Sequence, residues 1–233
     1  MRVSVIVFPG SNCDHDVVHA FGDLLGHSVS MVWHRDTDLQ NPDLVVLPGG
    51  FAYGDYLRTG ALAKVSPAMA EVRRYVAKGG RVLGICNGFQ ILCEVELLPG
   101  VLLQNSERRF LSQFVSLRVD SPKSFITAGV KEGTIVTCPI AHGEGNYYAD
   151  NETLKRLEGD GRVVFRYCDE QGTVDASSSI SNPNGSAGSI AGISNESGTV
   201  VGLMPHPERS LEKLVGGLGA GSCMPLLEQC SLR

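Results

Sequence analysis

Short apolar runs alternate with longer amphipathic segments along the first hundred residues of the chain. Strands are expected at 2–8, 28–33, 43–50 and 81–86, and helices at 13–26, 66–80 and 87–98. The helix at 66–80 has Ser66 as its expected cap and Pro67 in its first position. Alternation of this kind is typical of βα units, so these residues predict a doubly wound α/β layer around a parallel sheet.

After Pro99 the pattern changes to strand-like runs that are separated by turn-rich segments, with few helical patterns between them. Strands are expected at 114–119, 134–140, 162–168, 189–195 and 199–205. The separator at 175–188 is rich in Ser, Asn and Gly, which predicts an exposed loop. A short helix is expected near Pro207, and the tail after about residue 212 is expected to be irregular and partly mobile. With no repeat and no clear linker, residues 1–233 predict a single domain with a mixed sheet.

The composition narrows the possible functions. The 233 residues are 42% hydrophobic and 19% charged, and the formal net charge of −5 favours neither disorder nor a nucleic-acid-binding surface. The first residues lack the features of a signal peptide, and no run reaches the ~18 apolar residues of a membrane span. We therefore expect a cytoplasmic protein whose partners are small molecules or other proteins. Seven cysteines without a CxxC pair match neither a disulfide framework nor a zinc site.

One cysteine has a special position. Cys86 lies where an apolar strand ends and a helix begins, and parallel sheets bind ligands at this edge. The surrounding "GICNG" has the pattern Gly-x-Cys-x-Gly, the thiol counterpart of the Gly-x-Ser-x-Gly nucleophile elbow. A helix amino terminus also favours a thiolate. From spacing alone, a nucleophile and a buried structural cysteine are about equally good interpretations.

A cysteine nucleophile needs a base, and His206 in "LMPHPERS" follows a predicted strand, with Glu208 placed to orient its ring. Without Cys86, a loop histidine and a helix-start carboxylate would explain both residues equally well. Gly49 and Gly50 end another predicted strand, and their backbone could form an oxyanion hole together with the N–H group of Asn87. A plain glycine-rich turn is the alternative.

Three motifs in this order, "LPGGFAYGDYLRTGALA", "GICNGFQIL" and "GLMPHPER", resemble those of the class I (triad) glutamine amidotransferases. More narrowly, "FPGSNCDHD", "PIAHGEGNYYA" and "NPNGS" followed by "IAGI" are similar to segments of the small glutaminase subunits of phosphoribosylformylglycinamidine synthases. The resemblance runs from about Val3 to Ser210. It implies a three-layer, flavodoxin-like, mostly parallel sheet with helices on both faces, and a catalytic triad of Cys86, His206 and Glu208.

The resemblance also implies that different subunits carry out different steps of the reaction. This chain would hydrolyse glutamine through a cysteine thioester and deliver ammonia to a large ATP-binding synthase subunit in purine biosynthesis, with a third, very small subunit in the complex. It would need no metal or cofactor itself, and ATP and Mg²⁺ would bind to the synthase subunit. Gln90 faces the substrate in one interpretation and has a capping or packing role in the other. His142 and Glu144 make at best half a metal site, so their loop is expected to be structural or to contact a partner.

Two other classes of function remain open. A different cysteine hydrolase on a similar sheet would cleave other amide or peptide substrates. A non-catalytic subunit would keep the fold and only bind a partner.

Overall fold

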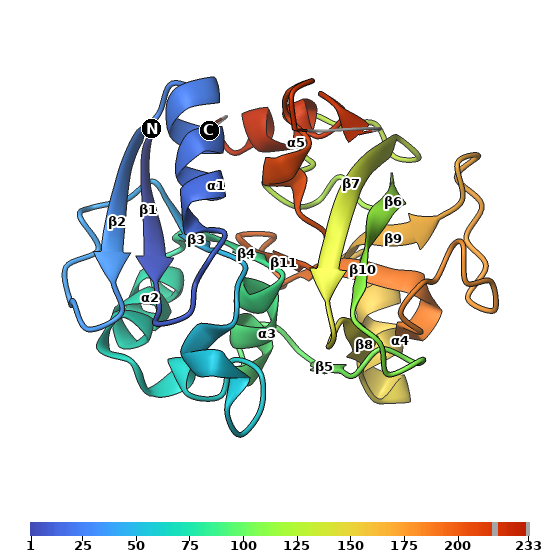
Figure 1. Cartoon of the computed structure of the whole chain (residues 1–233), viewed down its shortest axis with the longest axis horizontal. Coiled ribbons are helices and arrows are strands. Elements are labelled where there is room, and N and C mark those ends of the chain that lie inside the picture. The colour runs from blue at the N-terminus through green and yellow to red at the C-terminus, as the bar shows by residue number, and fades with distance from the viewer. Residues whose placement is uncertain (216–218, 232–233) are drawn as a thin grey trace.

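The structure is a computed structural model, and it describes residues 1–215 and 219–231. Within them, nine strands form one sheet in the order β2-β1-β3-β4-β11-β10-β9-β6-β7 (Figure 1). Their bounds are β1 (Arg2–Val7), β2 (Ser28–Trp33), β3 (Leu44–Leu47), β4 (Arg81–Ile85), β6 (Leu111–Val119), β7 (Ile135–His142), β9 (Val163–Cys168), β10 (Ile190–Ser194) and β11 (Val200–Leu203). Two short strands, β5 (Val101–Leu103) and β8 (Asn146–Tyr148), pair with each other outside this sheet.

Helices of several kinds cover the sheet. The α-helices of the described residues are α1 (Asp14–Val18), α2 (Pro67–Ala77), α3 (Asn87–Glu94), α4 (Asn151–Gly159) and α5 (Met224–Gln229). Helix α1 continues as a π-helical segment, η1 (His19–Leu24), and 3₁₀ turns form at η2 (Ala52–Asp55), η3 (Ala63–Val65), η4 (Ala187–Ser189) and η5 (Pro207–Arg209). In Figure 1, α1 and α5 lie in the upper half of the view, and α2, α3 and α4 lie in the lower half. None of the helices in these residue ranges has the length and apolar composition that crossing a membrane requires.

The strand pairing changes from parallel to antiparallel after β11. Strands β2, β1, β3, β4 and β11 are mutually parallel, whereas β10, β9, β6 and β7 extend the sheet through antiparallel pairs. The expected α/β fold with a mixed sheet is confirmed, whereas the mostly parallel sheet that the resemblance implied is corrected, because half of the strand pairs are antiparallel. For the β10–β11 pair the reason lies in the connection, because the short segment 195–199 allows an antiparallel pair, whereas a parallel pair needs a long crossover.

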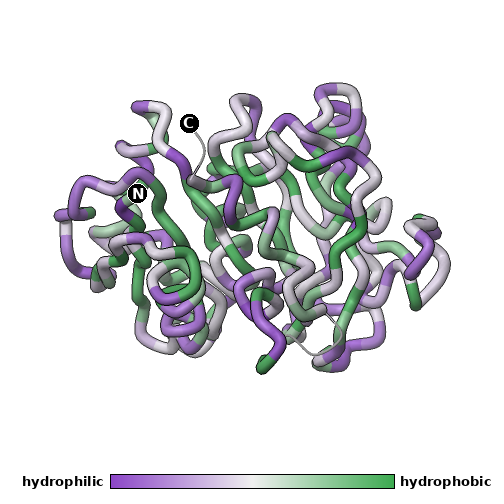
Figure 2. The backbone as a smooth tube through the Cα atoms, turned by 90° about the horizontal axis from the view of Figure 1, so that it is seen from above, coloured by the Kyte–Doolittle hydropathy of each residue, from purple (hydrophilic) through white to green (hydrophobic). Residues whose placement is uncertain are grey.

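The buried core holds in place the turn at Cys86, which joins β4 to α3. One continuous group of buried apolar side chains extends from β1 to α5. Strands β3 and β11 are buried at every residue, as strands covered on both faces are. Helix α3 is buried from Asn87 to Cys93 and packs against β3, β4 and β11. Figure 2 shows the same distribution, with hydrophobic stretches in the interior and hydrophilic ones mainly in peripheral loops.

Each strand predicted from the sequence is present in the sheet, with ends that shift by a few residues. Helix α4 was not predicted, because only Thr153 and Leu157 of its residues are buried and its apolar face is correspondingly narrow. The side chain of Asp150 caps it by accepting a hydrogen bond from the Thr153 N–H group at 2.8 Å. The predicted cap of α2 is different, since Ser66 occupies the N-cap position but its side chain makes no capping hydrogen bond.

Two expectations about loops need correction. Residues 175–180 are mostly exposed, but polar side chains of the second half of the predicted exposed loop are buried, namely Ser181, Asn182, Asn184 and Ser186. Asn184 donates hydrogen bonds to Gly145 O at 2.7 Å and to Tyr167 Oη at 3.2 Å, which explains why a polar loop can lie inside. The tail is not irregular throughout, because α5 buries Leu226 and Leu227. The part of the expected tail at 216–218 and 232–233 lies outside the described residues.

Candidate active site

Cys86 occupies the sharp turn that joins β4 to α3. Its backbone has φ of 52° and ψ of −107°, a conformation that L-residues rarely adopt. Glycine is needed on both sides, because a Cβ atom at Gly84 would lie 2.5 Å from Leu92 Cδ1 and one at Gly88 would lie 2.0 Å from Leu47 O. The turn therefore has the form of a nucleophile elbow, and strain of this kind, about 1–3 kcal/mol, is concentrated at functional sites.

Strand β11 brings His206 and Glu208 to the same edge of the sheet. It runs parallel to β4, and the Cys86 N–H group donates to Leu203 O at 2.8 Å, so both strands end side by side. His206 Nδ1 lies 2.7 Å from Glu208 Oε1, and the two residues are only 1% and 4% exposed. The carboxylate thereby holds one ring nitrogen and leaves the other, Nε2, for a reacting group.

Cys86 and His206 both line a cavity of about 160 Å³. It is lined by Asn12, Cys13, Gly50, Phe51, Cys86, Phe110, Ala141, His206 and Arg209. The Cys86 sulfur is near enough to influence the charge of the His206 ring, although Nε2 makes no hydrogen bond within the described residues. The structure thus brings the three predicted triad residues together, while their catalytic roles stay predictions.

The electrostatic surroundings of His206 favour a protonated ring. Burial lowers its pKa, but the carboxylate of Glu208 and the sulfur of Cys86 outweigh burial and raise the pKa of His206 to about 10. The imidazole can therefore hold a proton at neutral pH, which is the form that a departing amine requires.

The predicted oxyanion region lies directly beside this pair. A Cβ atom at Gly49 would be 2.6 Å from His206 Cε1, so only glycine lets the imidazole pack against the backbone. Gly50 has φ of 141° and lines the cavity. Within the described residues, neither the Gly50 N–H nor the Asn87 N–H donates a hydrogen bond to a protein group. Both donors are thus free for an oxyanion, and this role stays a prediction.

The side chain of Gln90 is held by hydrogen bonds to other groups of the protein. Its Nε2 donates to Glu144 O at 2.6 Å, and its Oε1 accepts from Asn87 Nδ2 at 2.9 Å. Asn87 Oδ1 in turn accepts the Ala52 N–H group at 3.1 Å. The two side chains therefore link α3 to the loop after Gly50, a packing role, and Gln90 is not among the residues that line the 160 Å³ cavity. Contact between Gln90 and a substrate stays a prediction.

Sequence reasoning did not single out Cys13 and Arg209, which also line the cavity. Arg209 donates to Asp16 Oδ2 at 2.7 and 2.9 Å and to Cys13 Sγ at 3.1 Å, which ties η5 to α1. Burial and the nearby Glu208 carboxylate raise the pKa of Cys13 to about 12, so this thiol stays protonated and is no rival nucleophile. Its position after β1, at the carboxyl edge of the sheet, was the available signal.

His142 is the last residue of β7 and comes directly after Ala141, which lines the cavity. Its Nδ1 lies 3.0 Å from Asn105 Oδ1, which also accepts the Gly145 N–H group at 3.0 Å. Burial, with a smaller contribution from the charge of His206, lowers the pKa of His142 to about 4. The residue is 3% exposed and neutral, which favours a structural role for its loop, and contact of the loop with a partner stays a prediction.

This burial predicts a loss of stability in mild acid. Below about pH 6.5 the unfolded chain protonates His142, whereas the folded chain does so only near pH 4, so unfolding takes up a proton. The free energy of unfolding should therefore fall by roughly 2 to 3 kcal/mol more in the native protein than in His142→Gln between about pH 7 and about pH 4.5. Urea unfolding at both pH values measures this difference. The exposed His15→Gln variant serves as control, and identical pH slopes for native protein and His142→Gln would contradict the prediction.

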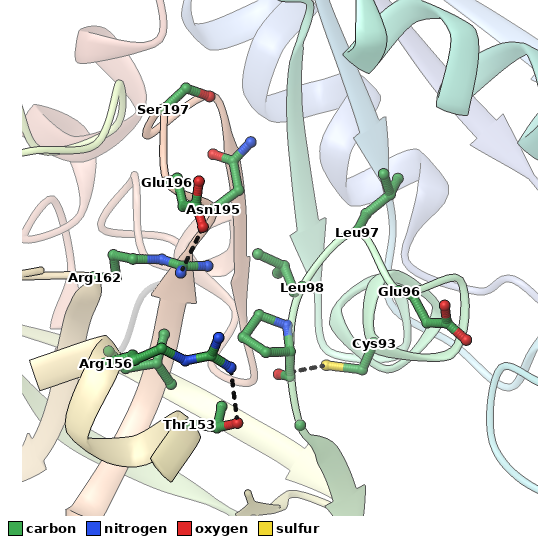
Figure 3. A pocket seen from close by; sticks show the side chains of 13 residues that line it. Cys93, Glu96, Leu97, Leu98, Thr153, Arg156, Arg162, Asn195, Glu196 and Ser197 are labelled. Carbon is green, nitrogen blue, oxygen red and sulfur yellow. Dashed lines mark hydrogen bonds and ion pairs between the residues drawn. The ribbon is translucent and has the colours of Figure 1, made fainter.

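A second cavity, of about 570 Å³, lies at the opposite edge of the sheet and holds none of the predicted residues. Arg156 and Arg162 extend into it, facing the segment that contains Leu98 (Figure 3). Arg162 is already paired with Ser194 O at 3.1 Å, and Arg156 donates to Thr153 Oγ1 at 3.3 Å. Across residues 1–215 and 219–231, no three His, Cys, Asp or Glu side chains gather closely enough to hold a metal ion.

Comparison with known proteins identifies the family. The sequence matches the CobB/CobQ-like glutamine amidotransferase domain family over residues 1–217. It is 53% identical to the phosphoribosylformylglycinamidine synthase subunit PurQ of Rhodopseudomonas palustris (strain HaA2), over 95% of this chain and 96% of that one. It is 52% identical to the PurQ subunit of Moorella thermoacetica, over 93% and 91% of the two chains. A chain in the structure of PurLQS from Thermotoga maritima has a TM-score of 0.83 and 40% identity, covering 98% of this chain and 96% of that one. The chain therefore belongs to the CobB/CobQ-like glutamine amidotransferases and, among them, to the PurQ subunits of phosphoribosylformylglycinamidine synthase.

Proposed function

We propose that this chain is the glutaminase subunit of a phosphoribosylformylglycinamidine synthase, which hydrolyses glutamine and passes the ammonia to an ATP-dependent synthase subunit. The observation that carries the proposal is that Cys86 and His206 line one cavity at the carboxyl edge of the sheet, while the buried Glu208 holds the far nitrogen of the His206 ring. A thiol, a base and an orienting carboxylate are the groups that amide hydrolysis through a thioester requires.

The first half of the reaction forms the thioester. The Cys86 sulfur attacks the side-chain amide carbon of glutamine, and a C–S bond forms as the carbonyl becomes an oxyanion. The free N–H groups of Gly50 and Asn87 stabilise this charge, and donors of this kind contribute ~3 kcal/mol each in acyl transfer. His206 then gives its proton to the amide nitrogen, the C–N bond breaks, and ammonia leaves.

The second half regenerates the enzyme. His206 takes a proton from water, the resulting hydroxide attacks the thioester carbon, and the C–S bond breaks to release glutamate and the Cys86 thiolate. Throughout, Glu208 keeps the ring oriented and stabilises its charged form, because its Oε1 holds His206 Nδ1 at 2.7 Å. This chemistry calls for no metal or cofactor in the subunit, and we propose that ATP and Mg²⁺ bind to the synthase partner.

The partners follow from the same proposal. A large ATP-binding synthase subunit would use the ammonia on formylglycinamide ribonucleotide, and a very small third subunit would complete the complex. Ammonia that escapes into neutral water becomes ammonium, a poor nucleophile, so the complex should pass it on directly. We also propose a cytoplasmic location for the complex and no contact of this chain with nucleic acid or membrane.

Two finer statements about the fold belong to the proposal. The parallel strands β2, β1, β3, β4 and β11, with helices α1 and α3 packed against them, would form a three-layer, doubly wound, flavodoxin-like arrangement. Residues 1–233 would form a single amidotransferase domain, which the continuous buried core from β1 to α5 supports.

Reconstitution of the complex tests the function. The chain is mixed with the ATP-binding subunit, the small subunit, ATP and formylglycinamide ribonucleotide, and glutamate and amidine product are measured with glutamine or ammonium as nitrogen source. We expect glutamine to support synthesis only when the chain is present, ammonium to support it without the chain, and the free chain to release little glutamate. Glutamine-dependent synthesis without the chain would overturn the proposal. Hydrolysis of other amide substrates without dependence on partners would indicate a different cysteine hydrolase, and complete absence of glutamate release would indicate a non-catalytic subunit.

A further inference from the structure

Strand β7 is the last strand of the sheet, so one of its edges has no neighbouring strand. Along an antiparallel strand, successive residues direct their backbone groups to opposite sides. On the free side, the Thr137 carbonyl accepts the Ser222 hydroxyl at 2.6 Å, and the Pro139 carbonyl accepts the His206 N–H group at 2.9 Å. Proline suits such an edge because it has no N–H group to pair. By the same alternation, the Ala141 carbonyl faces outward from the sheet, toward the catalytic cavity.

The distances agree with this register. The Cys86 thiol donates to Ala141 O at 3.8 Å, and Ala141 lines the cavity. Within the described residues this thiol is the only donor outside the sheet that reaches the Ala141 carbonyl. Once Cys86 reacts as a thiolate or becomes a thioester, the thiol proton is gone. The carbonyl then needs another donor, because a desolvated acceptor left unpaired is costly.

We propose that the Ala141 carbonyl accepts an N–H group of the side-chain amide of glutamine, an inference that rests on the proposed function. This contact would favour binding of an amide over a carboxylate at the reacting carbon. A carbon bound to Cys86 Sγ places its oxygen and nitrogen substituents close to Ala141 O. The oxygen is repelled by the carbonyl and attracted by the free N–H groups of Gly50 and Asn87. The amide could bind with either its oxygen or its nitrogen toward Ala141. The second orientation is favoured, so the nitrogen faces the Ala141 carbonyl.

The same contact distinguishes substrate from product. Glutamate carries two oxygens on the carbon where glutamine carries one oxygen and one nitrogen, so one carboxylate oxygen would face the Ala141 carbonyl. The resulting repulsion disfavours the bound product and leaves the cavity free for glutamine. A γ-ester of glutamate has no N–H group and cannot use the contact, which makes it the natural comparison substrate.

Asn105 holds the end of β7 in place and is a positioning residue for this carbonyl. Its Nδ2 donates to His142 O at 2.8 Å, and its Oδ1 lies 3.0 Å from His142 Nδ1. It also accepts the Gly145 N–H group at 3.0 Å. These bonds immobilise the residue after Ala141 and therefore the peptide group between them.

A backbone ester tests the proposal directly. Replacing His142 by its α-hydroxy acid turns the Ala141 carbonyl into an ester carbonyl, which is a weaker acceptor. In the assembled complex, kcat/KM is measured from glutamate release for glutamine and for glutamate γ-methyl ester. We expect a loss of roughly 5- to 10-fold for glutamine, the size of one hydrogen bond, and less than about 2-fold change for the methyl ester. The matched control replaces Cys138 by its α-hydroxy acid, which removes a comparable strand N–H group and weakens the Thr137 carbonyl instead.

A conventional variant gives a second measurement should the ester protein fail to fold. Asn105→Ala is expected to lower kcat/KM for glutamine more than for the methyl ester. Asn182→Ala, which removes another buried asparagine that bonds only loop carbonyls, should affect both substrates alike. Equal losses for the two substrates in Asn105→Ala, or no loss in the ester protein, would overturn the proposal. Failure of the native complex to release glutamate from glutamine would instead refute the proposed function.

Discussion

Replacing Cys86 with alanine is expected to abolish glutamine hydrolysis in the assembled complex, with a fall in kcat of at least about 10³-fold. The sulfur is the atom that forms the thioester, and no neighbouring group can replace it. Cys13, the other thiol in the cavity, has a pKa raised to about 12 by burial and by Glu208, so it does not supply a thiolate. Glutamate release from glutamine, with the partner subunits, ATP and formylglycinamide ribonucleotide present, measures the loss.

Two controls show whether the activity is lost because the nucleophile is missing or because the fold or the complex is damaged. Cys93 is a buried cysteine of α3 whose thiol donates to Pro99 O at 3.8 Å and which does not line the catalytic cavity, so Cys93→Ala should keep most of the activity. Ammonium should still support synthesis in the Cys86→Ala complex, because ammonia production alone is lost. If glutamate release survives in Cys86→Ala, or if Cys93→Ala is equally inactive, Cys86 is not the nucleophile.

Gly88→Ala is expected to destabilise the whole protein. The added methyl carbon would lie 2.0 Å from Leu47 O and 2.7 Å from Leu47 C, and these are backbone atoms of β3 that no rotamer change can move. Helix α3 must then shift away from the sheet. Overpacking typically costs about 1–3 kcal/mol, and a clash with backbone atoms places this substitution near the upper end, at about 3 kcal/mol. For a chain of this size the melting temperature should fall by roughly 6–12 °C. Glutaminase activity should fall as well, because the shift displaces Cys86.

Gly159→Ala is the matched control for this experiment. Gly159 ends α4, and a Cβ atom there would meet no atom within 4 Å. The substitution should leave the melting temperature unchanged or raise it slightly, because alanine reduces the freedom of the unfolded chain. A Gly88→Ala protein as stable as Gly159→Ala would show that the contact between α3 and β3 is looser than the structure indicates.

Local patterns explain which parts of the fold were predictable. The nine strands of the sheet follow from apolar runs, because a strand needs only a few neighbouring residues to show its burial. Helix α4 was missed because its buried face is narrow. The buried half of the loop at 175–188 was missed for another reason: Asn184 is polar, and only its partners Gly145 and Tyr167, distant in the sequence, make its burial possible. The helical part of the tail likewise depends on the core against which Leu226 and Leu227 pack.

By itself, the sequence determined the elbow and the two residues that face it. Gly84, Cys86 and Gly88 lie within five positions, and His206 and Glu208 lie two apart, so local motifs suffice to make them candidates, and the resemblance to the amidotransferases assigns them to a triad. The tertiary structure alone decided what surrounds them. Cys13 follows β1 and Ala141 lies in β7, the last strand of the sheet, and only the folded chain brings both to the cavity at which β4 and β11 end. Such neighbours leave no local signal, because their burial and hydrogen bonds are set by groups far away along the chain.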